Sequence, residues 1–511
     1  MSLGNLLAAI LAASILPSTQ AEPSTGQSFG PSTEVAAQRG PAVFNAVYDS
    51  LHKWGCTVHP NGMSIYLATV PEGVLLHHGN DRNLTPTRPD WLAYEIEHAE
   101  MFARTHRPGP PRGPGKHMGD DRGDDSTEPR EELRRRDEGR AALLGTGETP
   151  LEEKHGWLHT YRTTRPLRFL YVDGMSGDKG NSGVLDTQQY ILRGDKDSKQ
   201  DSRAEQLFGD KPRGPPGEYD LVLDLCDLCA DWKLQGVIRT EGAGFEIIKC
   251  DFSDGLQEVQ AMQRADTQGD QPPYRGPKGP GGPGGPEGPG GPRHHLPRPG
   301  DRYRDIGSRR TVLDYSSMVS AFFFPVNLTN PDSSHPDLPR LSSTTKADRT
   351  AIREYLSQVV EARYDQPLAS FTWKDIADLV VRRYAKELSS MTDTNSTETL
   401  ASRIHFLLEV FIDYSVADEE LRITEAKDRC STFYIQTMLL ETEVDRLIYS
   451  GFRAVNAEIC ATLFNIRTFL GSNLDDDATL KDVKENLRSL MDYLSWRDYV
   501  TTDSKMARRL L

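Results

Sequence analysis

Residues 73–86 read GVLLHHGNDRNLTP, an apolar run that ends abruptly in two histidines and a glycine. Branched and apolar side chains in such a run favour a strand, and the Gly, Asn, Asp and Pro residues that follow are typical of a turn. His78 and Gly79 therefore stand where a strand ends. Two interpretations of this corner remain open: a ligand-binding position, or the end of a buried strand whose histidine bonds to the backbone.

The surrounding patterns predict an α+β domain over residues 41–265. SIYLATV (64–70) reads as a strand, and WLAYEIEHAEMFAR (91–104) begins as a strand and continues as an amphipathic helix. The later patterns are strand-like over 156–174, helical over 219–232 and hairpin-like over 236–252. A helix is also expected early in this domain, within residues 43–55.

Two low-complexity tracts divide the chain. Residues 105–154 are predicted to be a disordered insertion, and residues 266–306 a Gly/Pro-rich linker. Residues 276–293 form six Gly-X-Y triplets, but no proline occupies the Y position, so a stiff linker is favoured over a collagen helix. From residue 307 an all-α helical domain is expected, because repeated apolar stripes follow a 3.6-residue period.

The first 21 residues contain an apolar stretch too short to span a bilayer, followed by a small-residue site, and predict a secretory signal peptide. Residues 22–40 are expected to be a flexible leader. Sequons at Asn83, Asn327 and Asn395 fit a secreted, extracellular glycoprotein, with the cell wall as one destination. No membrane insertion is expected to persist after signal cleavage.

The six cysteines suit an oxidising compartment. Fifteen pairings are open; we expect Cys430 to pair with Cys460, and the other four to staple the N-terminal domain. The CDLC motif (226–229) favours structural disulfides over zinc or redox chemistry, because it has no second pair or nearby histidine. The formal net charge of −15 argues against nucleic acid as a partner.

Four stretches in order resemble the ADP-ribosyltransferase fold of the His-Tyr-Glu type. They are LLHHG (75–79), WLAYEIEHAEMFAR (91–104), LHTYRTTRPLRFLYVD (158–173) and GVIRTEGAGFEIIKCDF (236–252). The resemblance implies a split antiparallel sheet with helices, and NAD as the substrate. It departs from the family in the neighbours of the motif histidine, His77 and Asn80, and in lacking a Glu-x-Glu ending at Glu246.

The same resemblance implies roles for individual residues. Glu246 matches the catalytic carboxylate, which would stabilise an oxocarbenium-like state electrostatically. His78 and Gly79 match the positions that hold the adenosine-side ribose, and Trp91 matches the stacking aromatic, with Tyr94 as an alternative. From the residues alone, Trp91 could equally be core and Glu246 an exposed strand carboxylate. No metal is predicted.

The chain also resembles, over most of its ordered part, a family of secreted proteins of filamentous fungi whose function is not established. Two alternative functions are therefore considered. One is NAD-dependent ADP-ribosyl transfer to a protein or small-molecule acceptor, or NAD hydrolysis. The other is a non-catalytic structural or interaction protein that keeps the fold. A fold resemblance does not decide between them.

Overall fold

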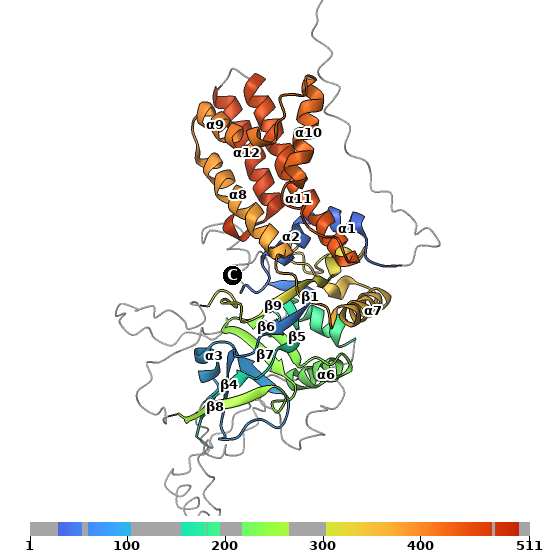
Figure 1. Ribbon diagram of the computed structural model, residues 1–511, viewed down its shortest axis with the longest axis vertical. Helices are drawn as coiled ribbons and strands as arrows, with labels where there is room; N and C mark the ends of the chain where they lie inside the picture. The colour runs from blue at the N-terminus through green and yellow to red at the C-terminus, as the bar shows by residue number, and fades with distance from the viewer. Residues whose placement is uncertain are drawn as a thin grey trace, which may run out of the picture.

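The computed structural model describes residues 29–53, 60–103, 155–180, 182–194, 217–264, 303–472 and 476–499 (Figure 1). In these ranges the chain forms a large sheet flanked by helices, with a helical region stacked against one end of it. The expected combination of an N-terminal mixed domain and a C-terminal helical region is confirmed. Residues 1–21, 105–154 and 266–302, where a signal peptide, an insertion and a linker were predicted, lie outside the described residues.

The sheet has nine strands in the order β8-β4-β2-β3-β7-β6-β5-β1-β9. The strands are β1 (Asn61–Val70), β2 (Leu75–Asn80), β3 (Asp90–Ala93), β4 (Trp157–Thr163), β5 (Leu167–Gly174), β6 (Gly236–Glu241), β7 (Gly244–Lys249), β8 (Leu256–Gln263) and β9 (Val312–Ser320). All neighbouring pairs are antiparallel except β5 and β6. The sheet is therefore continuous and mixed, where a split antiparallel sheet was expected.

The parallel pair follows from the connection between its strands. Parallel neighbours need a long crossover, because the chain must return to the same end of the sheet. Between β5 and β6 the chain runs through the π-helix η1 (Thr187–Leu192) and the helix α6 (Glu218–Asp231). Cys226 of α6 is bonded to Cys250, the residue that follows β7, so a disulfide fastens this helix to the sheet.

Helices α7 to α12 form most of the C-terminal part. They are α7 (Lys346–Arg363), α8 (Trp373–Asp393), α9 (Thr397–Leu408), α10 (Glu419–Thr432), α11 (Glu443–Ser472) and α12 (Asp476–Leu494). Capping boxes begin α7 at Thr345 and α8 at Thr372, each with an aspartate three residues later. Residues 430–452 carry a helical apolar stripe in the sequence, but α10 ends at Thr432 and α11 begins at Glu443.

The boundary between the sheet and the helical region is less simple than the sequence indicated. β9 lies inside residues 307–511, yet it pairs with β1 and completes the sheet. The helices α1 (Thr33–Gln38) and α2 (Gly40–Tyr48) come first in the described chain but pack on α11 (Figure 1). Phe44 of α2, for example, contacts Phe452 with 4.6 Å between ring centroids. α1 also lies within the expected flexible leader.

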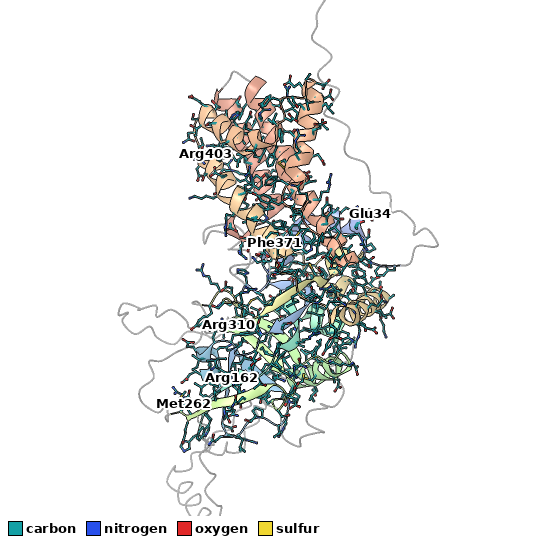
Figure 2. The ribbon with its side chains drawn as sticks, in the orientation of Figure 1. Glu34, Arg162, Met262, Arg310, Phe371 and Arg403 are labelled. Atoms are coloured by element: carbon teal, nitrogen blue, oxygen red, sulfur yellow. A yellow bond between two sulfur atoms is a disulfide. The ribbon has the colours of Figure 1, made fainter. Side chains whose placement is uncertain are left out.

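One hydrophobic core runs through both parts, from Ala36 to Trp496. Figure 2 shows the side chains along the whole molecule, from Met262 of β8 at one end to Arg403 of α9 near the other. Burying this continuous apolar surface stabilises the sheet and the bundle together. No helix within the described ranges is long and apolar enough to cross a membrane.

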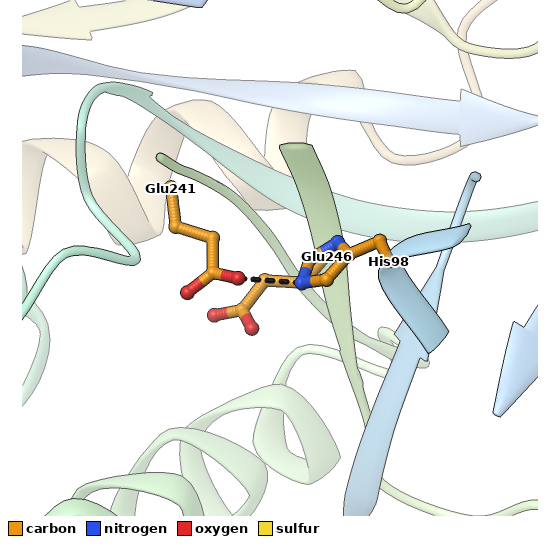
Figure 3. A group of neighbouring side chains, drawn as sticks. All are labelled: His98, Glu241 and Glu246. Carbon is orange, nitrogen blue, oxygen red and sulfur yellow. Dashed lines mark ion pairs between the residues drawn. The ribbon is translucent and has the colours of Figure 1, made fainter. Parts of the chain in front are cut away.

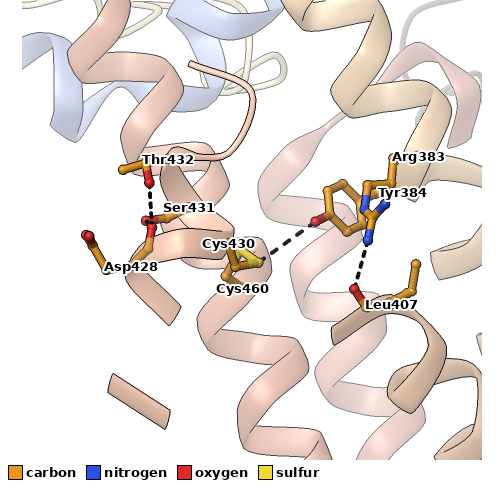
Figure 4. Close-up of a disulfide and its surroundings, with 8 residues drawn as sticks. All are labelled: Arg383, Tyr384, Leu407, Asp428, Cys430, Ser431, Thr432 and Cys460. Atoms are coloured by element: carbon orange, nitrogen blue, oxygen red, sulfur yellow. Dashed lines mark hydrogen bonds between the residues drawn. A yellow bond between two sulfur atoms is a disulfide. The ribbon is translucent and has the colours of Figure 1, made fainter. Parts of the chain in front are cut away.

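The cysteines match the expectation in part. Cys430 of α10 and Cys460 of α11 form the predicted disulfide (Figure 4). Of the four expected to staple the N-terminal domain, Cys226 and Cys250 pair, whereas Cys229 is a free, buried thiol. Cys229 lies one helical turn beyond Cys226, and burial raises the pKa of its thiol to about 12. Cys56 lies outside the described residues.

Candidate functional site

The register of four strands places Glu246 in a lateral row of side chains. His77 of β2 pairs with Ala93 of β3, Ala93 with Glu246 of β7, and Glu246 with Arg239 of β6. Paired residues in antiparallel strands project to the same face of a sheet. His77, Glu246 and Arg239 therefore share one face, and Trp91, two residues before Ala93, shares it too.

Glu246 is buried and ion-paired. Its Oε1 accepts a hydrogen bond from Nε of Arg239 at 2.8 Å, and Nη2 of Arg239 lies 2.6 Å from the same oxygen as an ion pair. Arg239 is completely buried and also donates to Glu218 Oε1 at 2.7 Å and to Gln188 Oε1 at 3.2 Å. Burial raises the pKa of Glu246, and the charge of Glu241 adds to this effect while Arg239 opposes it.

A histidine and a second glutamate lie beside Glu246 (Figure 3). His98 belongs to α3 (Ile96–Glu100), and its Nε2 lies 2.5 Å from Oε1 of Glu241 at the end of β6. Burial alone would lower the pKa of His98, but the hydrogen bond to Glu241 and the charges of Glu241 and Glu246 outweigh it, so the pKa is raised. The same pairing lowers the pKa of Glu241 despite its burial. The pair is therefore best described as imidazolium and carboxylate.

These three side chains could also offer ligands to a metal ion. One ligand atom from each of His98, Glu241 and Glu246 lies within 4.8 Å of the others. One imidazole and two carboxylates suit a divalent transition metal. However, Glu246 is already ion-paired with Arg239, and a cation would have to displace the ion pair between His98 and Glu241. The arrangement as described is an ion-pair cluster.

His78 does not lie in this cluster. It is the neighbour of His77 along β2, so its side chain projects to the opposite face of the sheet. There it is buried, with Nδ1 2.8 Å from the carbonyl oxygen of Trp91 and its ring packed edge-on against Phe252. Burial lowers the pKa of His78. The structure thus separates His78 from Glu246, although the resemblance assigned both to one NAD site.

Gly79 does lie on the face of Glu246, but another group uses the space beside it. A Cβ atom at Gly79 would stand 2.0 Å from the carbonyl oxygen of Ala99 and 2.7 Å from the amide nitrogen of Ala103. The missing side chain therefore lets the α3 segment approach the strand. The α3 segment therefore occupies the space beside Gly79 where the resemblance placed the adenosine-side ribose.

The two aromatic candidates differ in their surroundings. Trp91 is partly buried and packs edge-on against Tyr219 of α6, with 5.9 Å between ring centroids. Its Nε1 is buried and has no hydrogen-bond partner within the described part of the chain. Tyr94 is fully buried, and its hydroxyl is 2.5 Å from Oγ1 of Thr311, so it belongs to the core.

Sequence reasoning missed three members of the cluster, His98, Glu241 and Arg239, and it missed the place of His77 in the lateral row. The signal that could have found His77 and Arg239 was the alternation of side chains along strands that pair with Glu246. His98 could not be placed in this way, because its position depends on how α3 packs over Gly79. Glu241 and Glu246 flank the predicted hairpin turn, so their proximity was within reach of the sequence.

Comparison with known proteins gives a family resemblance without a function. Residues 33–270 match the family model of the YPL277C N-terminal domain. Two uncharacterized proteins of Saccharomyces cerevisiae are similar: YPL277C, 29% identical over 233 residues, and YOR389W, 28% identical over 235 residues. Each match covers 43% of this chain, and it spans 42% of YPL277C and 33% of YOR389W. No solved structure matches. These findings support the resemblance to an uncharacterised fungal family.

Proposed function

We propose that the sheet face bearing Glu246 acts on NAD, by ADP-ribosyl transfer to an acceptor or by hydrolysis. The observation that carries the proposal is the lateral row itself. A buried carboxylate, Glu246, shares its face with a partly buried tryptophan, Trp91, and lies beside the His98–Glu241 pair. Groups of these types are what cleavage of a nicotinamide–ribose bond requires.

In this proposal Glu246 supplies the negative charge. As the bond from ribose C1′ to nicotinamide breaks, nicotinamide leaves with the electron pair and positive charge develops on the ribose. A fixed carboxylate stabilises that charge, and Arg239 holds the carboxylate in place through a hydrogen bond and an ion pair. Water or an acceptor hydroxyl then bonds to C1′ and passes its proton to Glu246.

The other residues would position the substrate. Trp91 offers an aromatic face and an unsatisfied N–H donor on the same side of the sheet. His98, held by Glu241, offers a charged donor beside Glu246 for ribose oxygens. His78 and Tyr94 have no part in this version of the site, because His78 faces the other side of the sheet and Tyr94 is in the core.

One observation favours a non-catalytic protein instead. Arg239 is completely buried and pairs with both Glu218 and Glu246, which is also how a structural ion-pair network satisfies itself. Under either function we propose that the protein is secreted. The predicted signal peptide supports this, as does the exposure of Asn83, Asn327 and Asn395, the three sequon asparagines.

The test is release of nicotinamide from NAD by the secreted protein and by two glutamine variants. Glu246→Gln keeps the side-chain size and one acceptor for Arg239, and it is expected to reduce turnover by at least about 100-fold. Glu72→Gln, in an exposed turn, is the matched control and is expected to keep full activity. Absence of NAD turnover and of NAD binding in the unaltered protein would reject the enzyme and leave the non-catalytic function.

A further inference from the structure

A cavity of about 560 Å³ lies between the sheet and the helical bundle, away from Glu246. Its walls come from the end of α2, the bundle helix α8, the short helix η6 (Arg497–Tyr499) and the segment that leads into β9. Figure 1 shows α2 and α8 meeting above β9. This volume falls in the range of small-molecule sites, roughly 300–1,000 Å³.

One wall is a charged stripe along α8. Lys374, Asp378, Arg382 and Lys386 recur at four-residue spacing, so they lie on one face of the helix and all line the cavity. Lys374 is committed to Asp378 by an ion pair. Arg382 and Lys386 are exposed, and neither has a carboxylate within ion-pair distance in the part of the chain that the structure describes. Two adjacent cations are thus available at the cavity.

The inner wall is polar, and most of its polar groups already have hydrogen-bond partners. Arg497 contacts the carbonyl oxygen of Tyr48 at 3.1 Å and stands 3.9 Å from the centre of its ring. Nδ1 of His52 lies 2.9 Å from the carbonyl oxygen of Ser50, which leaves its Nε2 as an acceptor. Burial, together with the charges of Arg497 and Lys374, lowers the pKa of His52 to about 4. His52 is therefore neutral at pH 7.

The cavity also has a free acceptor, on a different wall from the cations of α8. Asp305 lines it, is exposed, and has no ion-pair partner among the described residues. Over all the lining residues, four cationic side chains face three aspartates, whereas the whole chain carries a net charge of −15. A locally cationic cavity in an acidic protein selects for an anion, and the aspartate selects for hydroxyl or amino groups on the same molecule.

We propose that this interdomain cavity binds a small phosphate monoester, with its phosphate at Arg382 and Lys386 and its hydroxyl or amino groups at Asp305. A guanidinium and an ammonium one helical turn apart present several donors to a tetrahedral dianion. The site is independent of Glu246 and of NAD. Because its walls belong to both the sheet and the bundle, the bound ligand would hold the two together.

The test is calorimetric titration of the full secreted chain, in phosphate-free buffer, with ribose 5-phosphate, AMP and inorganic phosphate. The two monoesters are expected to bind, and more tightly than inorganic phosphate. The double variant Arg382→Gln/Lys386→Gln is expected to weaken their binding by about tenfold or more. The control double variant Lys481→Gln/Arg488→Gln removes the same charges from an exposed face of α12 and is expected to bind as the parent does.

A third variant distinguishes recognition of the phosphate from recognition of the hydroxyl or amino groups. Asp305→Asn is expected to weaken binding of ribose 5-phosphate and to leave binding of inorganic phosphate unchanged. All these positions are exposed, so the variants are expected to fold, and unfolding curves check this. The proposal is overturned if no monoester binds, if binding survives in Arg382→Gln/Lys386→Gln, or if inorganic phosphate binds as tightly as the monoesters.

Discussion

Replacing Arg239 by methionine tests whether the two buried glutamates depend on its charge for the stability of the fold. Arg239 is 0% exposed and bonds to Glu218 and Glu246, which are 6% and 5% exposed. Without it, two buried carboxylates would remain close together with no guanidinium. Removing one partner of a buried ion pair costs about 3–5 kcal/mol, because the charge left behind is uncompensated. We expect Arg239→Met to lose about that much unfolding free energy at pH 7.

The assay is urea unfolding followed by circular dichroism. The control is Arg162→Met, which makes the same substitution at an exposed position of β4. The double variant Arg239→Met/Glu246→Gln is expected to recover part of the loss, since it removes one uncompensated charge. A carboxyl whose pKa is raised in the fold costs stability as the pH rises above its unfolded value. The difference in unfolding free energy between the parent and Arg239→Met should therefore shrink as the pH falls towards about 4.

Two outcomes would refute this reasoning. A loss below about 1 kcal/mol, typical of an exposed ion pair, would mean that water reaches the cluster. A double variant no more stable than Arg239→Met would mean that the uncompensated charge on Glu246 is not the source of the cost.

Two further predictions concern stability. Removal of the Cys430–Cys460 disulfide, whose ends are 30 residues apart, by the double alanine variant should cost about 3–4 kcal/mol by loop entropy; a melting temperature equal to that of the parent would contradict this. Burial raises the pKa of Asp173 to about 7 from an ordinary value of 3.8, so the folded state binds a proton that the unfolded state has lost between about pH 4 and pH 7. The parent should lose up to about 4 kcal/mol of stability over that window, and Asp173→Asn should not. Unfolding free energies of both proteins at pH 4, 5.5, 7 and 8 measure the difference, and parallel curves would show that Asp173 titrates normally.

The existence of most strands and helices could be predicted because each carries its own periodicity. β6 and β7 contain short β-branched runs on either side of a glycine-containing turn, and α8 shows a 3.6-residue apolar stripe. The order of the strands could not be predicted, because it depends on pairings between distant segments. β9 illustrates this: a strand after a long low-complexity tract closes the sheet beside β1, although the residues near it read as the start of a helical domain.

The residues assigned to the candidate site from the sequence do not all lie together in the structure. Motif matching selected His78 because histidine and glycine are adjacent there, yet a shift of one residue along a strand moves a side chain to the other face. The pairing with β3 and β7 puts His77, not His78, on the side of Glu246. Both histidines lie within a strand, and no local pattern in the sequence reveals which of the two projects to the face that carries Glu246.

The two functions proposed for Glu246 can be separated because Arg239 has a second partner. In Glu246→Gln, Arg239 remains paired with Glu218 at 2.7 Å, so its charge is still compensated and the fold is expected to persist. Loss of turnover in that variant would therefore report on chemistry. Arg239→Met offers no such separation, since it removes the guanidinium that both glutamates share and leaves Lys179, 3.9 Å from Glu218, as the nearby cation. An unaltered fold with no NAD turnover in the parent, by contrast, would leave the buried network as a purely structural feature of the sheet.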